Sequence, residues 1–348
     1  MPADSGSLDV SPLRRIDDDK YEPAKDERKA HRFGSPGPLG SDLVERVLQL
    51  PPGYDRQLAY AMAVISGWSY AHIRTLGNKL KYYGLPGVTI DRIAVTNPAM
   101  SIVSTAFFVR SACGRIGVLS FRGTEPSNIV NWLTDTDTVP RRFGNGKVHR
   151  GFYANVQAVW EDIESKLRES FVVDGDSNGK PRQPMQQLYI TGHSLGAAMA
   201  VLAAAKIWKD GDARVREALR GIYTYGQPAV GDAAFVKEFE PHIGRMLFRH
   251  AYGFDVVPYL PPLTTGDYRH FGSVRIATRA DEAWVEPNLP RQQARDLVLT
   301  IATCFASYVG RRIPPINRLE AHIFKYSFFD DHSPTNYIET SRAALRGD

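Results

Sequence analysis

The amino-acid sequence predicts an α/β fold, in which a mostly parallel central sheet is flanked by helices. Three observations support this class. Short apolar segments typical of buried strands alternate with longer segments of helical periodicity. The apolar segment LYIT leads through a short turn into the small-residue helix AAMAVLAAAKI. The first two expected strands, TAFFVRSA and RIGVLSFRG, are spaced as a hairpin.

The expected elements follow one another along most of the chain. A helical region begins at Ser41, a suitable N-cap residue, and continues to Ile73, with apolar residues recurring every three or four positions. The elements expected after it are TAFFVRSA, RIGVLSFRG, the helix FYANVQAVWEDIESKLRES, QLYITGHS, the helix LGAAMAVLAAAKIWKD, GIYTYGQ, RMLFRHAY and SVRIATR. This alternation predicts helices on both faces of the sheet.

The chain divides into a tail and one domain. Residues 1–40 are rich in Asp, Lys, Arg, Pro and Gly and poor in aliphatic residues, so they lack the apolar surface that offsets the entropy of ordering. Residues 41–348 suffice for a single large α/β domain. The apolar stretch from Leu297 to Val309 predicts a further helix within 289–312, which is too short to span a bilayer. This helix either packs on the domain or forms a cap.

Composition argues against several functional classes. The 43 basic and 38 acidic residues leave a formal net charge of only +5, and no basic run is interleaved with aromatic residues, so nucleic acid is not an expected partner. The two cysteines, Cys113 and Cys304, provide neither a disulfide framework nor a metal-ligand spacing. A phosphate-binding GxxxxGK motif is also absent from the sequence. We therefore expect no metal ion and no cofactor.

The strongest motif is Gly192-His193-Ser194-Leu195-Gly196, a GxSxG that follows an expected strand and opens an expected helix. A serine on such a turn stands above the sheet, and its glycine neighbours avoid clashes. Backbone N–H groups at the helix N-terminus can bind an oxyanion. The alternative is a tight turn without a catalytic role. In this context the motif predicts that Ser194 is a nucleophile and that the fold is the α/β-hydrolase fold.

A nucleophilic serine needs a histidine base and an acid that orients it, and in this fold the acid precedes the histidine in the sequence. Asp255 follows the expected strand RMLFRHAY and is the candidate acid, although an Asx turn before Pro258 is its alternative role. The histidines downstream are His270, His322 and His332. His332 lies in a polar loop near the C-terminus and is the preferred base. By contrast, His270 precedes a strand and His322 lies in an expected helix.

An oxyanion hole needs two donors. One is expected from the N–H of Leu195, directly after the nucleophile, and the other from Thr124, through its N–H and hydroxyl. Gly123 lets the backbone approach closely at this point. By itself the segment SFRGT is equally typical of a strand that ends in a turn. Together with GHSLG, it predicts an oxyanion hole.

The order and spacing of nine short motifs resemble the fungal-type (class 3) lipases of the α/β-hydrolase superfamily. These motifs fall within residues 55–340 and are Phe121-Arg122-Gly123-Thr124, Asn131-Trp132, Val148-His149, Gly151-Phe152, GHSLG, Tyr225-Gly226-Gln227-Pro228, Asp255-Val256-Val257-Pro258, the Tyr268/His270/Gly272 segment and Asp331-His332. The resemblance implies a catalytic triad of Ser194, Asp255 and His332. It also implies that Thr124 and Leu195 line the oxyanion hole.

The resemblance has two further implications. His149 is expected to support the active site, and the stretch from Glu125 to Trp132 is expected to be a lid that opens at a lipid surface. The 77-residue separation between Asp255 and His332 is expected to accommodate a helical insertion before the catalytic histidine.

The expected function is hydrolysis of carboxylic ester bonds in lipids, as in a triacylglycerol lipase or esterase, with a lipid or ester substrate met at a lipid–water interface. Ser194 attacks the carbonyl, His332 takes the serine proton, and water then cleaves the acyl-enzyme. Phospholipase A1 or galactolipase activity needs the same residues and is the first alternative. A non-catalytic lipid-binding protein with this fold is the second. The sequence does not determine an oligomeric state.

The N-terminal segment bears on cellular location. It lacks the basic start and the apolar core of a secretory signal. This pattern favours a cytoplasmic location, with secretion as the alternative if a signal peptide has been removed.

Overall fold

The structure is a computed structural model. It describes residues 14–15, 39–40, 42–97, 102–124, 140–175, 179, 181–261, 267–287 and 330–346. Most of the tail expected at 1–40 lies outside the described residues. So do the expected lid at 125–132, the expected helix within 289–312, Cys304 and His322. The predictions made for these segments therefore stay predictions.

The centre of the molecule is an eight-stranded sheet in the order β1-β2-β3-β4-β9-β10-β12-β14. Its strands are β1 (Arg14–Arg15), β2 (Thr89–Asn97), β3 (Ile102–Arg110), β4 (Ile116–Phe121), β9 (Gln187–His193), β10 (Leu219–Tyr225), β12 (Leu247–Tyr252) and β14 (Ser273–Ala277). Strands β1 to β4 pair antiparallel, and every pair from β4 to β14 is parallel. The parallel part and the β3–β4 hairpin were both predicted from the sequence.

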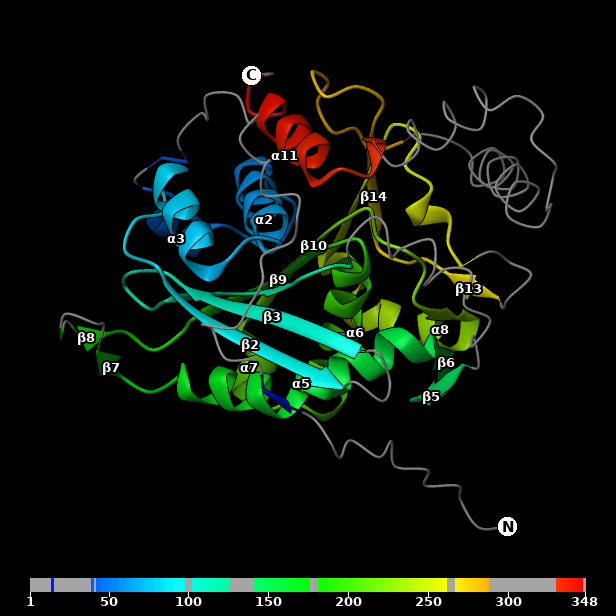
Figure 1. The fold of residues 1–348 in the computed structure, drawn as a ribbon, viewed down its shortest axis with the longest axis horizontal. Helices are drawn as coiled ribbons and strands as arrows, with labels where there is room; N and C mark the ends of the chain where they lie inside the picture. The colour runs from blue at the N-terminus through cyan, green and yellow to red at the C-terminus, as the bar shows by residue number, and fades with distance from the viewer. Residues whose placement is uncertain are drawn as a thin grey trace, which may run out of the picture.

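Helices cover both faces of this sheet (Figure 1). One face carries α1 (Leu43–Gln49), α2 (Arg56–Trp68), α3 (Ile73–Tyr82) and α11 (Pro334–Ala343). The other carries α5 (Arg150–Glu169), α6 (Leu195–Asp210), α7 (Ala213–Ala218) and α8 (Ala233–Ile243). Each face buries its own apolar cluster, so the sheet is covered on both sides, as buried parallel strands require.

Smaller elements lie beside the main sheet. A second sheet has the strand order β13 (Tyr268–Arg269), β11 (Gly231–Asp232), β6 (Gly146–Val148) and β5 (Arg141–Phe143), and β7 (Asp174–Gly175) pairs with β8 (Pro181–Arg182). Two short 3-10 helices, η5 (Gly244–Met246) and η6 (Val257–Tyr259), precede and follow β12. Strands of two or three residues are too short to show a hydrophobic period, so the sequence did not predict them.

Two expectations about the first elements need correction. Helix α1 begins at Leu43 with Asp42, not Ser41, in the N-cap position, and the Asp42 side chain makes no capping hydrogen bond. Strand β2 was not predicted, because the adjacent polar residues Asp91 and Arg92 interrupt its apolar alternation. Its pairing with β3 along its whole length, from Thr89 to Asn97, stabilises it as a strand.

A carboxylate joins the first two helices. The Asp55 side chain caps α2 by accepting a 2.7 Å hydrogen bond from the N–H of Leu58. Both of its oxygens also accept 3.0 Å bonds from the guanidinium of Arg46 on α1. This bidentate pair holds α1 against the start of α2.

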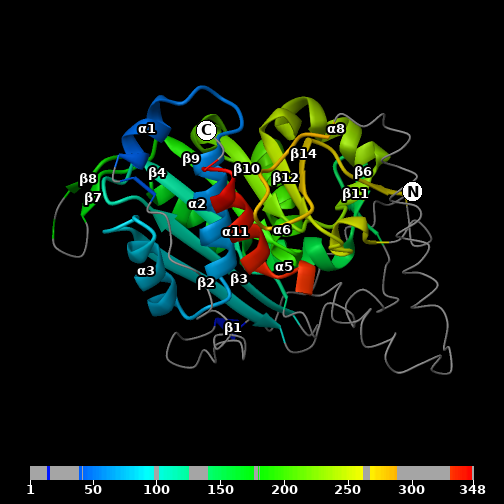
Figure 2. The ribbon, with the colours of Figure 1, turned by 90° about the horizontal axis from the view of Figure 1, so that it is seen from above.

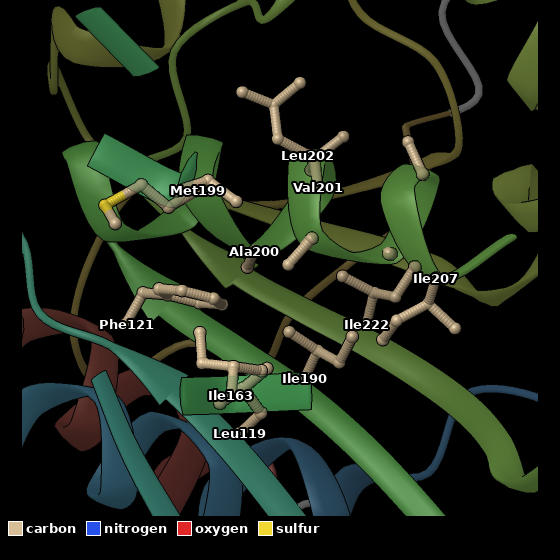
Figure 3. Packing of buried hydrophobic residues seen from close by; sticks show 14 of the residues in the cluster. Leu119, Phe121, Ile163, Ile190, Met199, Ala200, Val201, Leu202, Ile207 and Ile222 are labelled. Atoms are coloured by element: carbon tan, nitrogen blue, oxygen red, sulfur yellow. The ribbon is translucent and has the colours of Figure 1, made fainter. Parts of the chain in front are cut away.

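The core beneath the nucleophile turn is formed by β4, β9 and β10 together with α5 and α6. Figure 3 shows Leu119 and Ile190 of the sheet beside Ile163 of α5 and Ala200 of α6. The alanine-rich sequence of α6 favours helix and lets the helix approach the strands closely. Strand β9 is buried along its entire length, so it provides a rigid base for the turn that follows.

Replacing Ile190 with alanine tests how much this core contributes. The side chain is fully buried, so we expect Ile190→Ala to lower the free energy of unfolding by about 2–5 kcal/mol. Val172→Ala is the matched control, because Val172 is 61% exposed and its loss should change stability by less than about 0.5 kcal/mol. Chemical denaturation measures both variants, and equal losses of unfolding free energy in the two would contradict the assigned core.

Candidate active site

Ser194 lies on a strained turn between β9 and α6. Its backbone has φ 60° and ψ −130°, and it is the one non-glycine residue with positive φ among those the structure describes. A side chain in this conformation costs free energy, and such strain is typical of a nucleophile held on a sharp strand-to-helix turn. The Ser194 N–H donates a 2.9 Å bond to the carbonyl of Tyr225, at the end of the neighbouring strand β10.

The two glycines of the GHSLG motif permit this turn to pack closely. A Cβ at Gly192 would lie 2.2 Å from the carbonyl oxygen of Gly196. A Cβ at Gly196 would lie 2.1 Å from the carbonyl oxygen of Phe121, the last residue of β4. No side chain fits at either position. The glycines therefore bring the first turn of α6 directly against the end of β4.

Asp255 and His332 form a buried pair. The Nδ1–H of His332 donates to Oδ2 of Asp255 at 2.7 Å, and both side chains are at most 1% exposed. Because the carboxylate can only accept, the proton of a neutral imidazole lies on Nδ1 and the lone pair lies on Nε2. Nε2 is buried and has no hydrogen-bond partner among the described residues. This tautomer leaves Nε2 able to accept a proton.

The two oxygens of Asp255 have different partners. Oδ1 accepts a 2.9 Å bond from the N–H of Val257, which is the Asx turn considered as the alternative role of this residue. Oδ2 accepts from His332 and from the hydroxyl of Tyr337 on α11, at 2.5 Å. Burial, together with the Asp255 carboxylate, raises the pKa of Tyr337 well above its usual value, so its hydroxyl stays a donor. Asp255 thus serves the turn and the histidine at once.

Backbone contacts place the histidine loop on the aspartate loop. Oδ2 of Asp331 accepts a 2.8 Å bond from the N–H of Phe254. Gly253 has φ 51°, and a Cβ there would lie 2.5 Å from the same Asp331 oxygen. The residues immediately before Asp255 and before His332 are therefore in direct contact, which fixes the distance between the two side chains.

Gly226 is the common neighbour of all three candidate catalytic residues. It follows Tyr225, whose carbonyl binds the N–H of Ser194. A Cβ on Gly226 would lie 2.8 Å from Oδ2 of Asp255 and 2.8 Å from Cε1 of His332. Its φ of +58° also favours glycine. The end of β10 thus brings the serine turn and the Asp–His pair together.

His193, the residue before the nucleophile, links the parts of the site. Its Nε2 lies 2.8 Å from the carbonyl oxygen of His332, and its Nδ1 lies 2.9 Å from the hydroxyl of Tyr70. A carbonyl only accepts, so Nε2 carries the proton and Nδ1 accepts from Tyr70. Burial, with the nearby His332, lowers the pKa of His193 well below its usual value. A neutral imidazole therefore ties the serine turn to the backbone of His332.

The loop after β4 lies beside the same turn. A Cβ on Gly123 would lie 2.1 Å from the Tyr70 hydroxyl and 2.6 Å from the carbonyl oxygen of His193. Thr124 follows directly, and Leu195 is the first residue of α6. The two residues predicted to form the oxyanion hole therefore belong to neighbouring segments of the chain.

The remaining described histidines near the site have structural contacts. The Nε2–H of His270 donates to the carbonyl oxygen of Pro258 at 2.6 Å, so His270 is not the histidine paired with Asp255. His149 occupies the N-cap position of α5, where its Nδ1 accepts from the N–H of Gly151 at 3.2 Å. Sequence reasoning did not assign roles to Tyr70, His193 or the Tyr337 hydroxyl. Nothing in the local pattern around them signals their contacts.

The comparisons with known proteins agree with this architecture. The family model of class 3 lipases matches residues 118–265. A lipase of Rhizomucor miehei is 26% identical over 294 residues, covering 77% of this chain and 75% of the relative. A secreted mono- and diacylglycerol lipase of Fusarium solani is 35% identical over 157 residues, covering 44% of this chain and 41% of the relative. The chain is therefore similar to the class 3 lipases, and the matched segment contains the GHSLG turn.

A solved structure extends the comparison to the whole fold. It is described as a triacylglycerol lipase whose catalytic centre is formed by a serine protease triad, and it superposes with a TM-score of 0.51 at 25% identity. The superposition covers 66% of this chain and 83% of that chain. The chain therefore has the α/β-hydrolase fold and is a serine ester hydrolase, as the sequence predicted.

Among the residues that the structure describes, no three His, Cys, Asp or Glu side chains gather as a metal site. Within the same part of the chain, no helix is long and apolar enough to cross a membrane.

The close contact at Gly226 predicts a selective loss of activity. In Gly226→Ala the new methyl group would displace Asp255 or His332, so we expect kcat/KM on a soluble ester to fall by about 100-fold or more. Gly179→Ala is the matched control: its φ is +76°, but a Cβ there meets nothing within 4 Å. Activity in the control should be unchanged. A fully active Gly226→Ala protein would show that this contact does not position the pair.

The buried neutral histidines predict that the free energy of unfolding decreases in mild acid. Burial lowers the pKa of His149 to about 4 and the pKa values of His250 and His270 to about 3. In the unfolded chain these groups take up protons below their ordinary pKa near 6.5, whereas in the folded chain they do not. The unfolded state then binds more protons, so stability decreases as the pH falls from about 6.5 towards 4.

Denaturation of His270→Gln between pH 8 and 4.5 measures this effect. Below pH 6.5 its stability should fall less steeply than that of the parent, by up to about 1.4 kcal/mol per pH unit. Above pH 7.5 the two curves should run parallel. Parallel curves of stability against pH over the whole range would mean that His270 does not contribute to the loss of stability in acid.

Proposed function

We propose that this protein cleaves carboxylic ester bonds of lipids through an acyl-enzyme formed on Ser194. In this mechanism Ser194 attacks the ester carbonyl while Nε2 of His332 takes the hydroxyl proton. The same proton is then given to the leaving alcohol. Water attacks the acyl-enzyme in the second half of the reaction, again with His332 as base.

The observation that carries this proposal is the buried Asp255–His332 pair beside the strained turn of Ser194. The 2.7 Å bond from Nδ1–H to Oδ2 directs the lone pair of Nε2 away from the carboxylate. Asp255 also stabilises the imidazolium that forms when His332 takes the serine proton. The bonds from Val257 and Tyr337 keep the carboxylate in one orientation during this change.

The negative charge that develops on the carbonyl oxygen requires donors. We assign the N–H groups of Leu195 and Thr124 to this oxyanion hole, with support from the contact between Gly123 and the serine turn. Leu195 begins α6, so the partial positive charge at the helix N-terminus adds to the stabilisation. These donors are fixed before substrate binds, because the glycine packing leaves the two segments little freedom to separate.

Uncharged glycerides are the proposed substrates, met at a lipid–water interface. Support comes from the relatives described as a mono- and diacylglycerol lipase and a triacylglycerol lipase. Phospholipase A1 or galactolipase activity would use the same catalytic residues. The Fusarium relative is described as secreted, which favours secretion over the cytoplasmic location suggested by the N-terminal sequence.

The decisive experiment compares the parent chain with Ser194→Ala. We expect fatty acid release from a soluble short-chain ester and from an emulsified long-chain triglyceride, and a loss of about 10⁶-fold in kcat when the nucleophile is removed. The ratio of the activities on these two substrates distinguishes a lipase from an esterase.

Residual activity in Ser194→Ala comparable to the parent would refute the nucleophile. Phospholipid and galactolipid are tested next with the parent protein. Activity on these two and not on triglyceride would replace the glyceride assignment while leaving the mechanism unchanged.

A further inference from the structure

A cavity of about 300 Å³ lies between α1, α2, the turn after α3 and the β3–β4 hairpin. Figure 2 shows α1 and α3 at the opposite end of the molecule from α8. The cavity walls are almost entirely aliphatic and include Val44 and Val47 of α1, Ile65 of α2, and Val88 and Ile116. None of the described residues that line it is aromatic. Such walls suit a flexible alkyl chain better than a ring system.

Glu45, Ser111 and Cys113 are the polar residues among those that line this cavity. The sulfur of Cys113 lies 3.4 Å from the hydroxyl of Ser111, and the nearby guanidinium of Arg115 helps to lower the pKa of the thiol. Arg115 also forms an ion pair with Glu45 of α1, another lining residue. Glu45 is 63% exposed and Arg115 is 25% exposed. Arg115 does not itself line the cavity, but it is paired with Glu45, which does, and it precedes Ile116, another lining residue. Its guanidinium therefore lies beside the cavity wall, and the Glu45 carboxylate that pairs with it stands largely in water.

We propose that this cavity binds a fatty acid, with its alkyl chain between α1 and α2 and its carboxylate paired with Arg115. An exposed ion pair contributes little free energy, so a ligand carboxylate can replace Glu45 at small cost. The guanidinium offers the two parallel N–H donors that a carboxylate prefers. Burial of the alkyl chain supplies most of the affinity, because each buried methylene group lowers the dissociation constant about fourfold.

The cavity is separate from the candidate active site. Along β4 it extends to Val118, which pairs with Tyr189, whereas the serine turn lies beyond Phe121, which pairs with Gly192. Three residues of strand separate these positions by about 10 Å. The reaction proposed above releases fatty acids, so the cavity would bind a product. Binding of a fatty acid to the cavity does not require Ser194, and the experiments that test this binding do not measure hydrolysis.

The Cys113 thiol reports on occupation of the cavity. Burial raises the pKa of Cys113, but its hydrogen bonds with Ser111 and Arg115 outweigh burial and bring the pKa below the ordinary value. The thiol should therefore react readily with iodoacetamide. In a Cys304→Ser chain, Cys113 is the single cysteine. We expect octanoate, decanoate and dodecanoate, each below its micelle concentration, to slow the alkylation saturably. The half-saturating concentration should fall with chain length until the cavity is full.

Two substitutions with opposite expected effects test the carboxylate. Arg115→Gln should raise the half-saturating concentration of decanoate about tenfold. Glu45→Gln removes the competing carboxylate and should lower it. In the parent, decanol should protect the thiol less well than decanoate does. In Arg115→Gln, decanol and decanoate should protect it equally well. Because Arg115 also contacts the thiol, half-saturating concentrations are compared, not absolute rates. Equal protection by decanol and decanoate in the parent would overturn the assignment of a fatty acid.

Filling the cavity tests the location. Val44→Trp and Val88→Trp come from two different walls, and each should raise the half-saturating concentration of decanoate more than tenfold. The matched control is Val172→Trp, an exposed valine outside the lining residues, which should bind as the parent does. Melting temperatures identify variants that fold. Unchanged protection in a folded filling variant, or no protection in the parent, would refute the site.

Discussion

The buried hydrogen bond between Asp255 and His332 is the constraint on which the rest of the site depends. A carboxylate that is almost fully buried must have its acceptor capacity satisfied, or its desolvation would destabilise the fold. Three donors do so: the imidazole, the Tyr337 hydroxyl and the N–H of Val257. These donors fix the loop after β12, the loop before α11 and α11 itself. The glycines at 226 and 253 leave the room that this arrangement needs.

His193 extends the same constraint to Ser194, the proposed nucleophile. Its imidazole is buried and neutral, so each ring nitrogen has one defined role, and both roles are taken by neighbours. Through Nε2 it holds the backbone of His332, and through Nδ1 it accepts from Tyr70, which also touches Gly123. A single side chain next to Ser194 therefore connects the proposed base His332, the GHSLG turn and the loop after β4. A network whose members are all satisfied is rigid, as fixed catalytic groups require.

Helix α2 connects the candidate active site with the aliphatic cavity. Its residues from Leu58 to Ile65 form one wall of the cavity. Immediately after the helix, the hydroxyl of Ser69 lies 2.8 Å from that of Ser120 on β4, and Tyr70 contacts His193. One face of α2 and the segment directly after the helix therefore meet two chemically different regions. One is lined by aliphatic side chains, and the other is a network of hydrogen bonds.

The sequence by itself determined the elements and residues whose signals are local. The strands of the main sheet from β3 to β14, helices α5 and α6, the GHSLG turn, Asp255 and the preferred His332 follow from periodicity, from one short motif and from chain order. Helices α7 and α8 and the short strands were not predicted. Only the tertiary structure decided that His332, not His270, pairs with Asp255, and that Asp255 also serves an Asx turn. It alone revealed the contacts of Tyr337, Tyr70 and His193, which join residues 82 to 139 positions apart. Such contacts leave no periodic trace in the sequence, because each depends on how distant segments pack.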